Sequence, residues 1–402
     1  MSVEYRRPAA EEFRSTLATT HVAFGEELRD DDVERQQELM PHDRLLSAYE
    51  DSRPVGTAAA YPFELTVPGG VLPAAGVTWV GVLPSHRRRG VLTGLMRRQL
   101  QDVHERGEPL AILWASESAI YGRFGYGIAA PVMSLEADLA RFRFRDDPGP
   151  VGAVRLIDAD EALRVLPPFY DGVRGARPGM LSRSDGWWRQ HKVADPEHWR
   201  RGAGPKFIAF LELDGEVAGY AMYRIKSEWE QGIPRGEARV IEVLASSSNA
   251  ERELWRFLFG LDLVARVDAW LFDPGSPLFL MVVDPRSLHL RISEGLWLRI
   301  VDLESALGGR TFAADEPVVL DVRDEFCPWN AGRWRIGPGA GRTHEDADLE
   351  LDVADLASAY LGAFDFHHLA AAQRVRELRP GALARASALF RTTRPPFCPE
   401  IF

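Results

Sequence analysis

The segment VGVLPSHRRRGVL, residues 80–92, carries the clearest structural signal in the sequence. Its apolar start predicts the end of a buried strand, its three arginines form a basic loop, and an amphipathic helix begins near Gly90. The first N–H groups of a helix have no partner within it, and the helix dipole adds partial positive charge there. A pyrophosphate could bind these groups, with Gly90 allowing close backbone approach and the arginines contacting phosphate oxygens. Since arginines at a helix start oppose the dipole unless an anion binds, the segment favours a phosphate site over a solvated basic surface.

A second segment, WASESAIYGRFGYG at residues 114–127, follows a predicted strand over 110–115. Ser116 leaves that strand, and a short helical turn presents Tyr121. A tyrosine at the end of a cleft can protonate a leaving thiolate, because a phenol and a thiol have comparable pKa values. Tyr126, between Gly125 and Gly127, is the competing candidate. A tyrosine before a glycine is more often a packing residue than an acid, so the residues alone leave the role open.

The order of elements around these segments is repeated further along the chain. A hairpin, a strand, a loop and a helix occur in the first segment, and the same order recurs with a hairpin turn at Asp214-Gly215. Aligning Val80–Leu83 with Ile241–Leu244 gives an offset of 161 residues, which indicates two copies of one α+β unit. The expected elements are strands at 44–50, 55–67, 77–83, 110–115 and 240–244, with helices at 89–105 and 250–263.

The third segment, about residues 291–402, begins with GLWLRI at 295–300. Strands are expected near 317–322 and 333–336, and helical stretches near 353–378 and 382–390. The glycine-rich GPGAGR at 337–342 lacks the Gly-Lys-Ser/Thr ending and the following helix of a phosphate loop. A turn between strands is therefore expected there.

The composition limits the class of protein. A chain of 402 residues predicts two or three domains, and RDDPGPVG at 145–152 is typical of a linker. The net charge of -11 argues against non-specific nucleic-acid binding but is compatible with a cationic substrate. No apolar run approaches the roughly 20 residues of a membrane helix, and the charged N-terminus does not resemble a secretory signal. With only two cysteines, Cys327 and Cys398, we expect no disulfide framework, no multi-cysteine metal site and a cytoplasmic location.

Several other residues could be considered for chemistry. An acidic stretch could guide polyamines to the site, although a solvated helix face is an equally good interpretation. His86 lies beside the basic loop, which argues against a role as base. Cys327 and Cys398 have no histidine near them in sequence and are expected to be packing residues. The acidic stretch contains Glu26, Glu27, Asp30, Asp31, Asp32 and Glu34.

Together, the two segments resemble the GNAT acetyltransferase superfamily. Its pyrophosphate motif, Gln/Arg-x-x-Gly-x-Gly/Ala, matches RRRGVL at 87–92, except that Leu92 stands where a small residue is usual. Its later Tyr-x-x-x-Gly-Phe/Tyr pattern matches Tyr121 to Tyr126. The combination of HRRRG, ASE-x-x-IYGRFGYG, GLWLRI and a final aromatic residue is similar to one branch, the Eis (enhanced intracellular survival) family of actinobacterial acetyltransferases.

This resemblance implies a fold and an assembly. The fold class would be α+β, with tandem GNAT folds and a C-terminal domain like sterol carrier proteins. The domains would be an acetyl-CoA-binding GNAT domain at 1–150, a degenerate GNAT-like domain at 151–290, and the sterol-carrier-like domain at 291–402. The second copy has SSSNAE at 246–251, without the arginines and the glycine, so no phosphate is expected to bind there. Eis proteins are hexamers, trimers of dimers, and a homohexamer is expected.

The resemblance also assigns site residues. The catalytic acid would be Tyr121, and the base would be the C-terminal carboxylate of Phe402. Phe24 and Glu27 would contact the substrate, with a core position as the alternative for Phe24. Acetyl-CoA would be the co-substrate, with no metal, and its contacts would be Val80, Gly81, Val82, Arg87, Arg88, Arg89, Gly90, Val91, Leu92, Thr93, Ser116 and Glu117.

The chain's last residues can be examined physically. RPPFCPEIF at 394–402 carries three prolines, which stiffen the tail and reduce the entropy lost on docking. Its apolar end favours burial over fraying, and a buried carboxylate has a raised pKa suited to accepting a proton from an ammonium group.

The resulting hypothesis is an N-acetyltransferase that acetylates aminoglycoside-like polycationic amines, at more than one position, by direct attack of the amine on the thioester. A protein lysine or another primary amine is the alternative substrate. A second alternative is a non-catalytic lipid- or partner-binding protein that uses its third segment.

Overall fold

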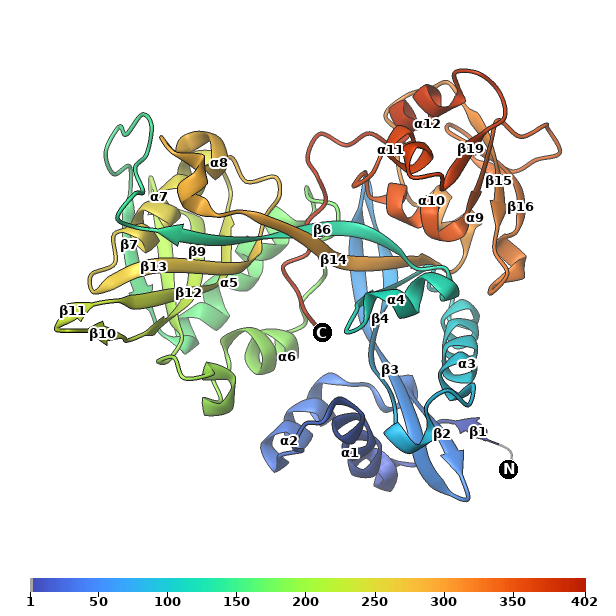
Figure 1. Cartoon of the computed structure of the whole chain (residues 1–402), viewed down its shortest axis with the longest axis horizontal. Helices are drawn as coiled ribbons and strands as arrows, with labels where there is room; N and C mark the ends of the chain where they lie inside the picture. The colour runs from blue at the N-terminus through green and yellow to red at the C-terminus, as the bar shows by residue number, and fades with distance from the viewer. Residues whose placement is uncertain (1–2) are drawn as a thin grey trace. The chain divides into compact units, whose positions relative to one another are not determined.

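The computed structural model describes residues 3–402, which form two compact units assembled from discontinuous segments (Figure 1). Unit 1 contains the described residues up to Ala130, together with Pro178–Ser182 and Gly295–Phe402. Unit 2 contains Pro131–Arg177 and Arg183–Glu294. The domain boundaries at residues 150 and 290 stay a prediction.

Unit 1 contains a sheet in the strand order β1-β2-β3-β4-β5-β14. Neighbours are antiparallel except β4 and β5, which are parallel and connected through helix α3. A parallel pair needs such a crossover because a tight hairpin can only join antiparallel strands. The strands are β1 (Glu4–Arg6), β2 (Leu45–Glu50), β3 (Arg53–Val67), β4 (Gly70–Val82), β5 (Leu110–Trp114) and β14 (Arg291–Ile300), of which residues 296–300 pair with β5.

Helices cover both faces of this sheet (Figure 1). Helix α3 approaches the face of Gly56, where a Cβ would lie 3.1 Å from Leu95 and Val91. The opposite face carries Thr57, whose Oγ1 lies 2.9 Å from that of Thr20. Because side chains alternate along a strand, β3 contacts a different helix at successive positions. The helices are α1 (Phe13–Phe24), α2 (Asp30–Leu39), α3 (Val91–Glu105) and the short α4 (Ser118–Tyr121).

Unit 2 repeats this plan, as the sequence offset predicted. Its sheet has the order β6-β13-β12-β9-β8-β7, with β12 and β13 parallel around helix α7. Gly219 corresponds to Gly56, since a Cβ there would lie 2.9 Å from Leu254 of α7. The elements are β6 (Gly127–Asp138), β7 (Ala153–Ile157), α5 (Ala159–Arg174), α6 (Asp185–Trp187), β8 (Phe207–Leu213), β9 (Glu216–Lys226), β10 (Trp229–Glu230), β11 (Ile233–Pro234), β12 (Gly236–Ala245), α7 (Ser248–Phe259), β13 (Val264–Phe272) and α8 (Leu278–Met281).

The strand that completes each sheet comes from a distant part of the chain. Strand β5 pairs with β14, which lies about 180 residues later in the sequence. Strand β13 pairs with β6, which precedes it by more than 120 residues. The two strands β6 and β14 are therefore exchanged between the repeats.

The third segment folds on a separate five-stranded sheet of unit 1, in the order β17-β16-β15-β18-β19. The turn between strands expected at residues 337–342 is confirmed for residues 337–340, which connect β16 to the short β17 at Gly341–Arg342. The helical stretch expected over 353–378 is wrong in part: Gly362 has a φ of 87°, and Val375–Glu377 forms strand β19. The elements are α9 (Leu303–Gly308), β15 (Val318–Arg323), β16 (Gly332–Ile336), β17 (Gly341–Arg342), β18 (Leu349–Asp352), α10 (Val353–Tyr360), α11 (Phe366–Ala371), β19 (Val375–Glu377) and α12 (Ala382–Phe390).

A search of the helices within residues 3–402 finds none that is both long and apolar enough to cross a bilayer.

Candidate active site

A bulge interrupts strand β4 where the cofactor contacts were predicted. Thr57 pairs with Gly81 and Ala59 with Thr78, so Trp79 and Val80 together oppose a single residue of β3. Trp79 has a left-handed φ of 53°, and its carbonyl accepts a hydrogen bond of 2.8 Å from Thr57 Oγ1. A bulge bends its strand and releases backbone groups from the ladder. Residues 80–82 therefore lie at and directly after a bend in the strand, which we call the kink of β4.

Strands β4 and β5 separate beside this bulge. Their ladder joins Ala74–Gly76 to Leu110–Ile112, and within residues 3–402 no further pairs continue it. From Val77 onward, β4 thus presents backbone N–H and C=O groups that β5 does not use. Such an edge can bind an extended ligand by main-chain hydrogen bonds.

The loop after β4 leads into an N-terminus of α3 that has no side-chain cap. Gly90 is the N-cap residue and has a φ of 81°, a conformation that favours glycine. A Cβ at Gly90 would meet no atom within 4 Å, so the space above it is open. Val91 is buried, whereas Leu92 and Thr93 are half-buried in the first turn. Unpaired N–H groups facing open space, at the positive end of the dipole, fit a pyrophosphate.

The three arginines of the loop have different surroundings. Arg87 donates to the carbonyls of Ala23 at 3.0 Å and Val82 at 3.4 Å, which ties the loop to α1 and β4. Arg89 lies 3.4 Å from a Glu50 oxygen. Arg88 is exposed, has a φ of 62°, and has no side-chain partner in the part of the chain that the structure describes. Arg88 is therefore the arginine whose donors are free for a ligand.

His86 has a structural partner. Its Nε2 lies 2.9 Å from Glu50, the same carboxylate that Arg89 approaches. This contact holds the histidine beside the loop.

Tyr121 is the last residue of α4 and lies mostly buried, with 5% of its surface exposed. It packs in the core that contains Ala75 and Val77, next to the point where β4 and β5 separate. Burial raises the pKa of Tyr121 to about 12, against a smaller lowering by its hydrogen bond with Ser116. The hydroxyl is therefore protonated throughout the physiological range. Ser116 and Glu117 are exposed just after β5.

Tyr126 is less suited to chemistry than Tyr121. It is fully buried, its hydroxyl has no partner within residues 3–402, and burial raises its pKa well above the usual range. The rings of the two tyrosines are 5.9 Å apart, edge to face. Tyr126 thus packs beneath Tyr121.

Residues 396–400 of the C-terminal tail are buried, whereas Ile401 and Phe402 at its end are half-buried. Phe397, Cys398 and Glu400 are all at most 5% exposed, and the Phe397 N–H donates to Pro178 at 2.9 Å. The ring of Phe402 lies 5.1 Å from that of Phe63 on β3. A Cβ at Gly76 would lie 2.5 Å from the Phe63 ring and 3.3 Å from the Phe402 ring, so the glycine leaves room mainly for Phe63 and thereby for this ring pair. The tail therefore ends against β3 and β4.

Phe24 and Glu27 lie at the end of α1. Phe24 is 46% exposed, so the alternative core position is wrong. Its ring is 3.8 Å from where a Cβ of Gly81 would lie. Glu27 is exposed in the loop that follows. Phe24 thus lies beside the kinked part of β4.

The acidic stretch continues into helix α2, whose first turn contains Asp30, Asp31 and Asp32. Asp30 pairs with Arg14 at 2.6 Å, and Arg35 contacts Asp31 and Asp32. Acidic side chains there stabilise the helix through its dipole. The pairs support the interpretation as a solvated helix face for these three residues.

A buried arginine supports the Tyr121–Tyr126 segment, and sequence reasoning did not assign it. Arg299 has no exposed side-chain surface and donates to both Asp324 oxygens at 2.6 and 2.7 Å. A Cβ at Gly125 would lie 2.7 Å from the Arg299 Cζ. The glycine therefore lets the turn rest on the guanidinium. An arginine inside the otherwise apolar GLWLRI strand was the available signal.

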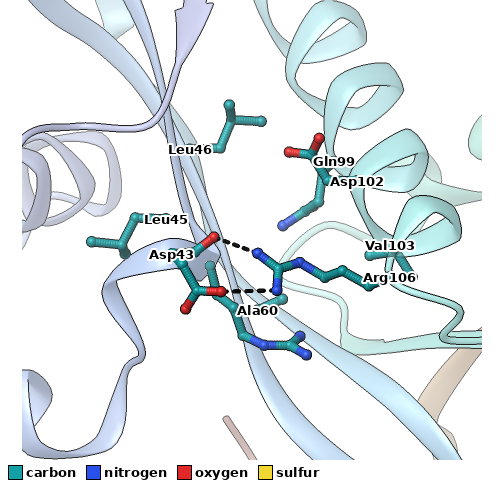
Figure 2. A pocket seen from close by; sticks show the side chains of 9 residues that line it. Asp43, Leu45, Leu46, Ala60, Gln99, Asp102, Val103 and Arg106 are labelled. Atoms are coloured by element: carbon teal, nitrogen blue, oxygen red, sulfur yellow. Dashed lines mark hydrogen bonds and ion pairs between the residues drawn. The ribbon is translucent and has the colours of Figure 1, made fainter.

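A small pocket between β2, β3 and α3 is too small to be the active site (Figure 2). Its volume is about 20 Å³, which is room for a single water molecule. Arg106 crosses it to the carboxylate and the carbonyl of Asp43, at 2.8 and 2.7 Å. Arg44 pairs with Glu108 at 2.5 Å. These polar groups bind each other.

Family models match three parts of the chain. Two models described as acetyltransferase (GNAT) domains match residues 4–129 and 179–300. A model described as a sterol carrier protein domain matches residues 303–399. The predicted fold class, tandem GNAT folds followed by a sterol-carrier-like α+β domain, is confirmed.

Full-length relatives agree with these matches. An uncharacterized N-acetyltransferase of Streptomyces avermitilis is 44% identical over 91% of both chains. The N-acetyltransferase Eis of Mycobacterium tuberculosis is 32% identical over 97% of both chains. The crystal structure of Eis1 from Mycobacterium abscessus covers all of both chains with a TM-score of 0.86 and 33% identity. The bulged strand, the uncapped helix start and these relatives together show that the chain belongs to the Eis family of GNAT N-acetyltransferases.

Proposed function

We propose that this acetyltransferase acetylates amines of aminoglycoside-like polycations, at more than one position, through direct attack of the amine on a thioester. The observation that carries the proposal is the uncapped N-terminus of α3 behind Gly90, beside the kink of β4. Acetyl-CoA supplies the acetyl group as an activated thioester when it is bound.

The chain's own residues would divide the binding of acetyl-CoA. The N–H groups of the first turn of α3 and the free guanidinium of Arg88 would hold the pyrophosphate. The released backbone groups of Val80, Gly81 and Val82 would orient the pantetheine arm. One of these N–H groups would also stabilise the negative charge that develops on the acetyl oxygen. Ser116 and Glu117, at the exit of β5, would line the opposite side.

Two groups would move protons. The Phe402 carboxylate would accept the proton of the attacking amine, directly or through one water. Tyr121 would donate to the sulfur as the C–S bond breaks. Its pKa of about 12 keeps the proton on the hydroxyl until negative charge develops on the sulfur, which would then accept it.

The acid role is tested by paired substitutions. We expect Tyr121→Phe to lower kcat for a kanamycin-type acceptor about 100-fold, the lower end for loss of a general acid. Tyr126→Phe is the matched control, because its hydroxyl has no hydrogen bond to lose within the described chain. Turnover would be followed by release of free CoA. Near-normal turnover of Tyr121→Phe would refute the role.

The base role is tested at the end of the chain. One glycine added after Phe402 displaces the carboxylate while keeping every side chain, and we expect it to lower kcat at least 100-fold. Phe402→Leu keeps a terminal carboxylate and loses only the ring contact with Phe63, so we expect its kcat to fall less. Equal losses in the two variants would contradict a catalytic carboxylate.

The substrate class rests on the exposed Phe24 beside the kink, on the exposed Glu27 in the loop after α1, and on the net charge of -11. A panel of acceptors should separate polycationic amines from a lysine-containing peptide. Faster acetylation of the peptide than of any aminoglycoside would favour a protein substrate. A homohexamer, expected from the family, would be checked by light scattering.

A further inference from the structure

A buried ion pair connects the third segment with residues 118–126, which we call the Tyr121 loop. Arg299 of β14 binds both carboxylate oxygens of Asp324, which follows β15 of the third segment. The rest of the guanidinium meets the turn at Gly125, where a Cβ would lie 2.7 Å from Cζ, 2.8 Å from Nη1 and 2.9 Å from Nε. The guanidinium therefore lies between the third segment and the Tyr121 loop.

The Asp324 carboxylate is itself held in place by the third segment. One oxygen accepts a hydrogen bond of 2.9 Å from the Cys327 N–H, and the other accepts one of 3.0 Å from Asn330 Nδ2. Asn330 also binds backbone groups of residues 300–303, at the end of β14 and directly after it. The acceptor of Arg299 is thus fixed by directional hydrogen bonds.

The Tyr121 loop depends on such support because its own elements are short. Helix α4 has four residues and is followed by a single 3₁₀ turn, and elements of this length are not stable without tertiary contacts. The Tyr126 N–H donates to the Tyr121 carbonyl at 3.3 Å, so the turn that rests on Arg299 is bonded directly to Tyr121. The ring of Phe326 in the third segment packs 5.1 Å from that of Phe124 in the loop.

We propose that Arg299 and Asp324 are positioning residues for acetyl transfer, which hold the Gly125 turn and through it Tyr121. A gain in stability does not account for the pair, since apolar residues of similar volume often stabilise a core equally well. Directional bonds fix a position, and a catalytic side chain has to stay within about 0.5 Å of its working geometry. The proposal rests on the acid role proposed for Tyr121. It gives the sterol-carrier-like segment a part in catalysis through Asp324.

The test neutralises both partners, so that no unpaired charge remains in the core. Arg299→Met with Asp324→Asn, the pair variant, keeps an acceptor for the Cys327 N–H. We expect kcat for a kanamycin-type acceptor to fall at least about tenfold, because small displacements of a catalytic group are costly. The KM for acetyl-CoA should not change. The matched control is Arg44→Met with Glu108→Gln, a mostly buried pair before β5, which should keep the wild-type kcat.

A double-mutant cycle shows whether the pair acts through the tyrosine. In a Tyr121→Phe background the pair variant should lower kcat by less than about twofold, because the hydroxyl that it positions is already absent. An equal fall of kcat in both backgrounds would overturn the proposal. Arg299→Lys keeps a charge without the planar group below Gly125, so its kcat should also fall. It provides a second reading if the pair variant misfolds, and a wild-type kcat would again overturn the proposal.

Hydrogen exchange separates this proposal from the acid role itself. In the folded pair variant the amides of the Tyr121 loop should exchange at least about tenfold faster, while those of β3 keep their rate. The control variant should change neither. Near-normal turnover of Tyr121→Phe would refute the acid role and with it the effect on kcat, but the exchange rates would still decide whether the pair holds the loop. Unchanged exchange of the loop would overturn the positioning role.

Discussion

Both repeats contain the same corner, a strand followed by a loop and a helix. The two corners differ in the capping and the charge of the helix N-terminus. In the corner of β4 and α3, the helix has no side-chain cap and three exposed arginines precede it. In the corner of β12 and α7, Ser247 accepts a hydrogen bond of 3.2 Å from the Ala250 N–H, and Glu251 lies in the first turn. The second helix satisfies one of its first N–H groups with its own serine and already has a carboxylate in its first turn, which disfavours binding of an external anion there.

The strands differ in the same sense. Both carry a bulge, at Trp79–Val80 of β4 and at Ile241 of β12. At the offset of 161 residues, Gly81 of the first corner corresponds to Glu242 of the second. Glu242 is buried and binds Arg183, Lys192 and Tyr220. The second repeat therefore has a buried polar cluster at the position where the first repeat has a glycine and no side chain.

The comparison teaches that one fold can leave different backbone and side-chain groups unsatisfied at the same corner. If acetyl-CoA binds as proposed, these groups, and not the fold alone, determine which repeat binds it. The following experiments, which go from the largest expected effect to the smallest, would break or sharpen this contrast.

Removing the charge of Glu242 should destabilise the second corner most. Glu242→Gln leaves Arg183 and Lys192 buried without their counter-ion, which typically costs about 3–5 kcal/mol. Hydrogen exchange of the β12 amides in the full chain would measure the loss locally. Glu212→Gln is the control, because Glu212 pairs with Arg155 at the surface and its loss should cost at most about 1 kcal/mol. A similar loss in both variants would contradict a structural role for the buried cluster.

The effect of Glu242→Gln should depend on pH. Burial alone would raise the pKa of Glu242, but the neighbouring Arg183 and Lys192 lower it below its usual range. Because the pKa of Glu242 is lower in the folded protein than the value of about 4.3 in the unfolded chain, its ionised form stabilises the fold above that pH. This stabilisation is lost as the pH falls through the folded pKa. The difference between wild type and variant should therefore be constant above about pH 5 and shrink below about pH 4.

Removing the free arginine of the first corner should weaken cofactor binding without weakening the fold. Arg88→Ala deletes a guanidinium with no side-chain partner in the described chain, so we expect about a tenfold rise in the KM for acetyl-CoA, or ~1.4 kcal/mol. The unfolding midpoint should not change. Arg141→Ala, an exposed arginine of unit 2, is the matched control. An unchanged KM would show that Arg88 is not a phosphate contact.

Removing the serine cap of the second corner should have the smallest effect. Ser247→Ala leaves the Ala250 N–H without its acceptor and should cost about 1 kcal/mol. Urea unfolding would measure it, with Ser248→Ala as the control because the structure gives that exposed side chain no hydrogen bond. Equal stability of the two variants would mean that the cap contributes nothing.

Much of the first corner could be predicted from sequence, because its signals are local. Apolar spacing located strands 45–50 and 53–67 and the helix ending at Glu105 to within about two residues. The basic loop before Gly90 indicated the candidate anion site. Which arginine is free could not be predicted, since the partners of Arg87 and Arg89 lie on α1 and β2.

Features that depend on distant contacts left little signal in the sequence. Strand β19 was hidden in a stretch with helical spacing, because three residues are too few for a strand pattern to show. The contact of Phe402 with Phe63 joins residues more than 300 apart, and the room for it depends on Gly76 lacking a side chain. The support of Gly125 by Arg299 joins residues about 170 apart in sequence. The Arg loop and Tyr121 were accessible from sequence, whereas their supporting contacts were not.

The exchange of β6 and β14 has a consequence for biosynthesis. A ribosome makes the chain from its N-terminus, so β5 emerges about 180 residues before its neighbour β14. During that interval the catalytic sheet keeps an open strand edge, the kind of surface that promotes aggregation. Closing it requires nearly three quarters of the chain, since β14 ends at Ile300. We therefore expect the nascent protein to depend on chaperones until the second repeat has been synthesised.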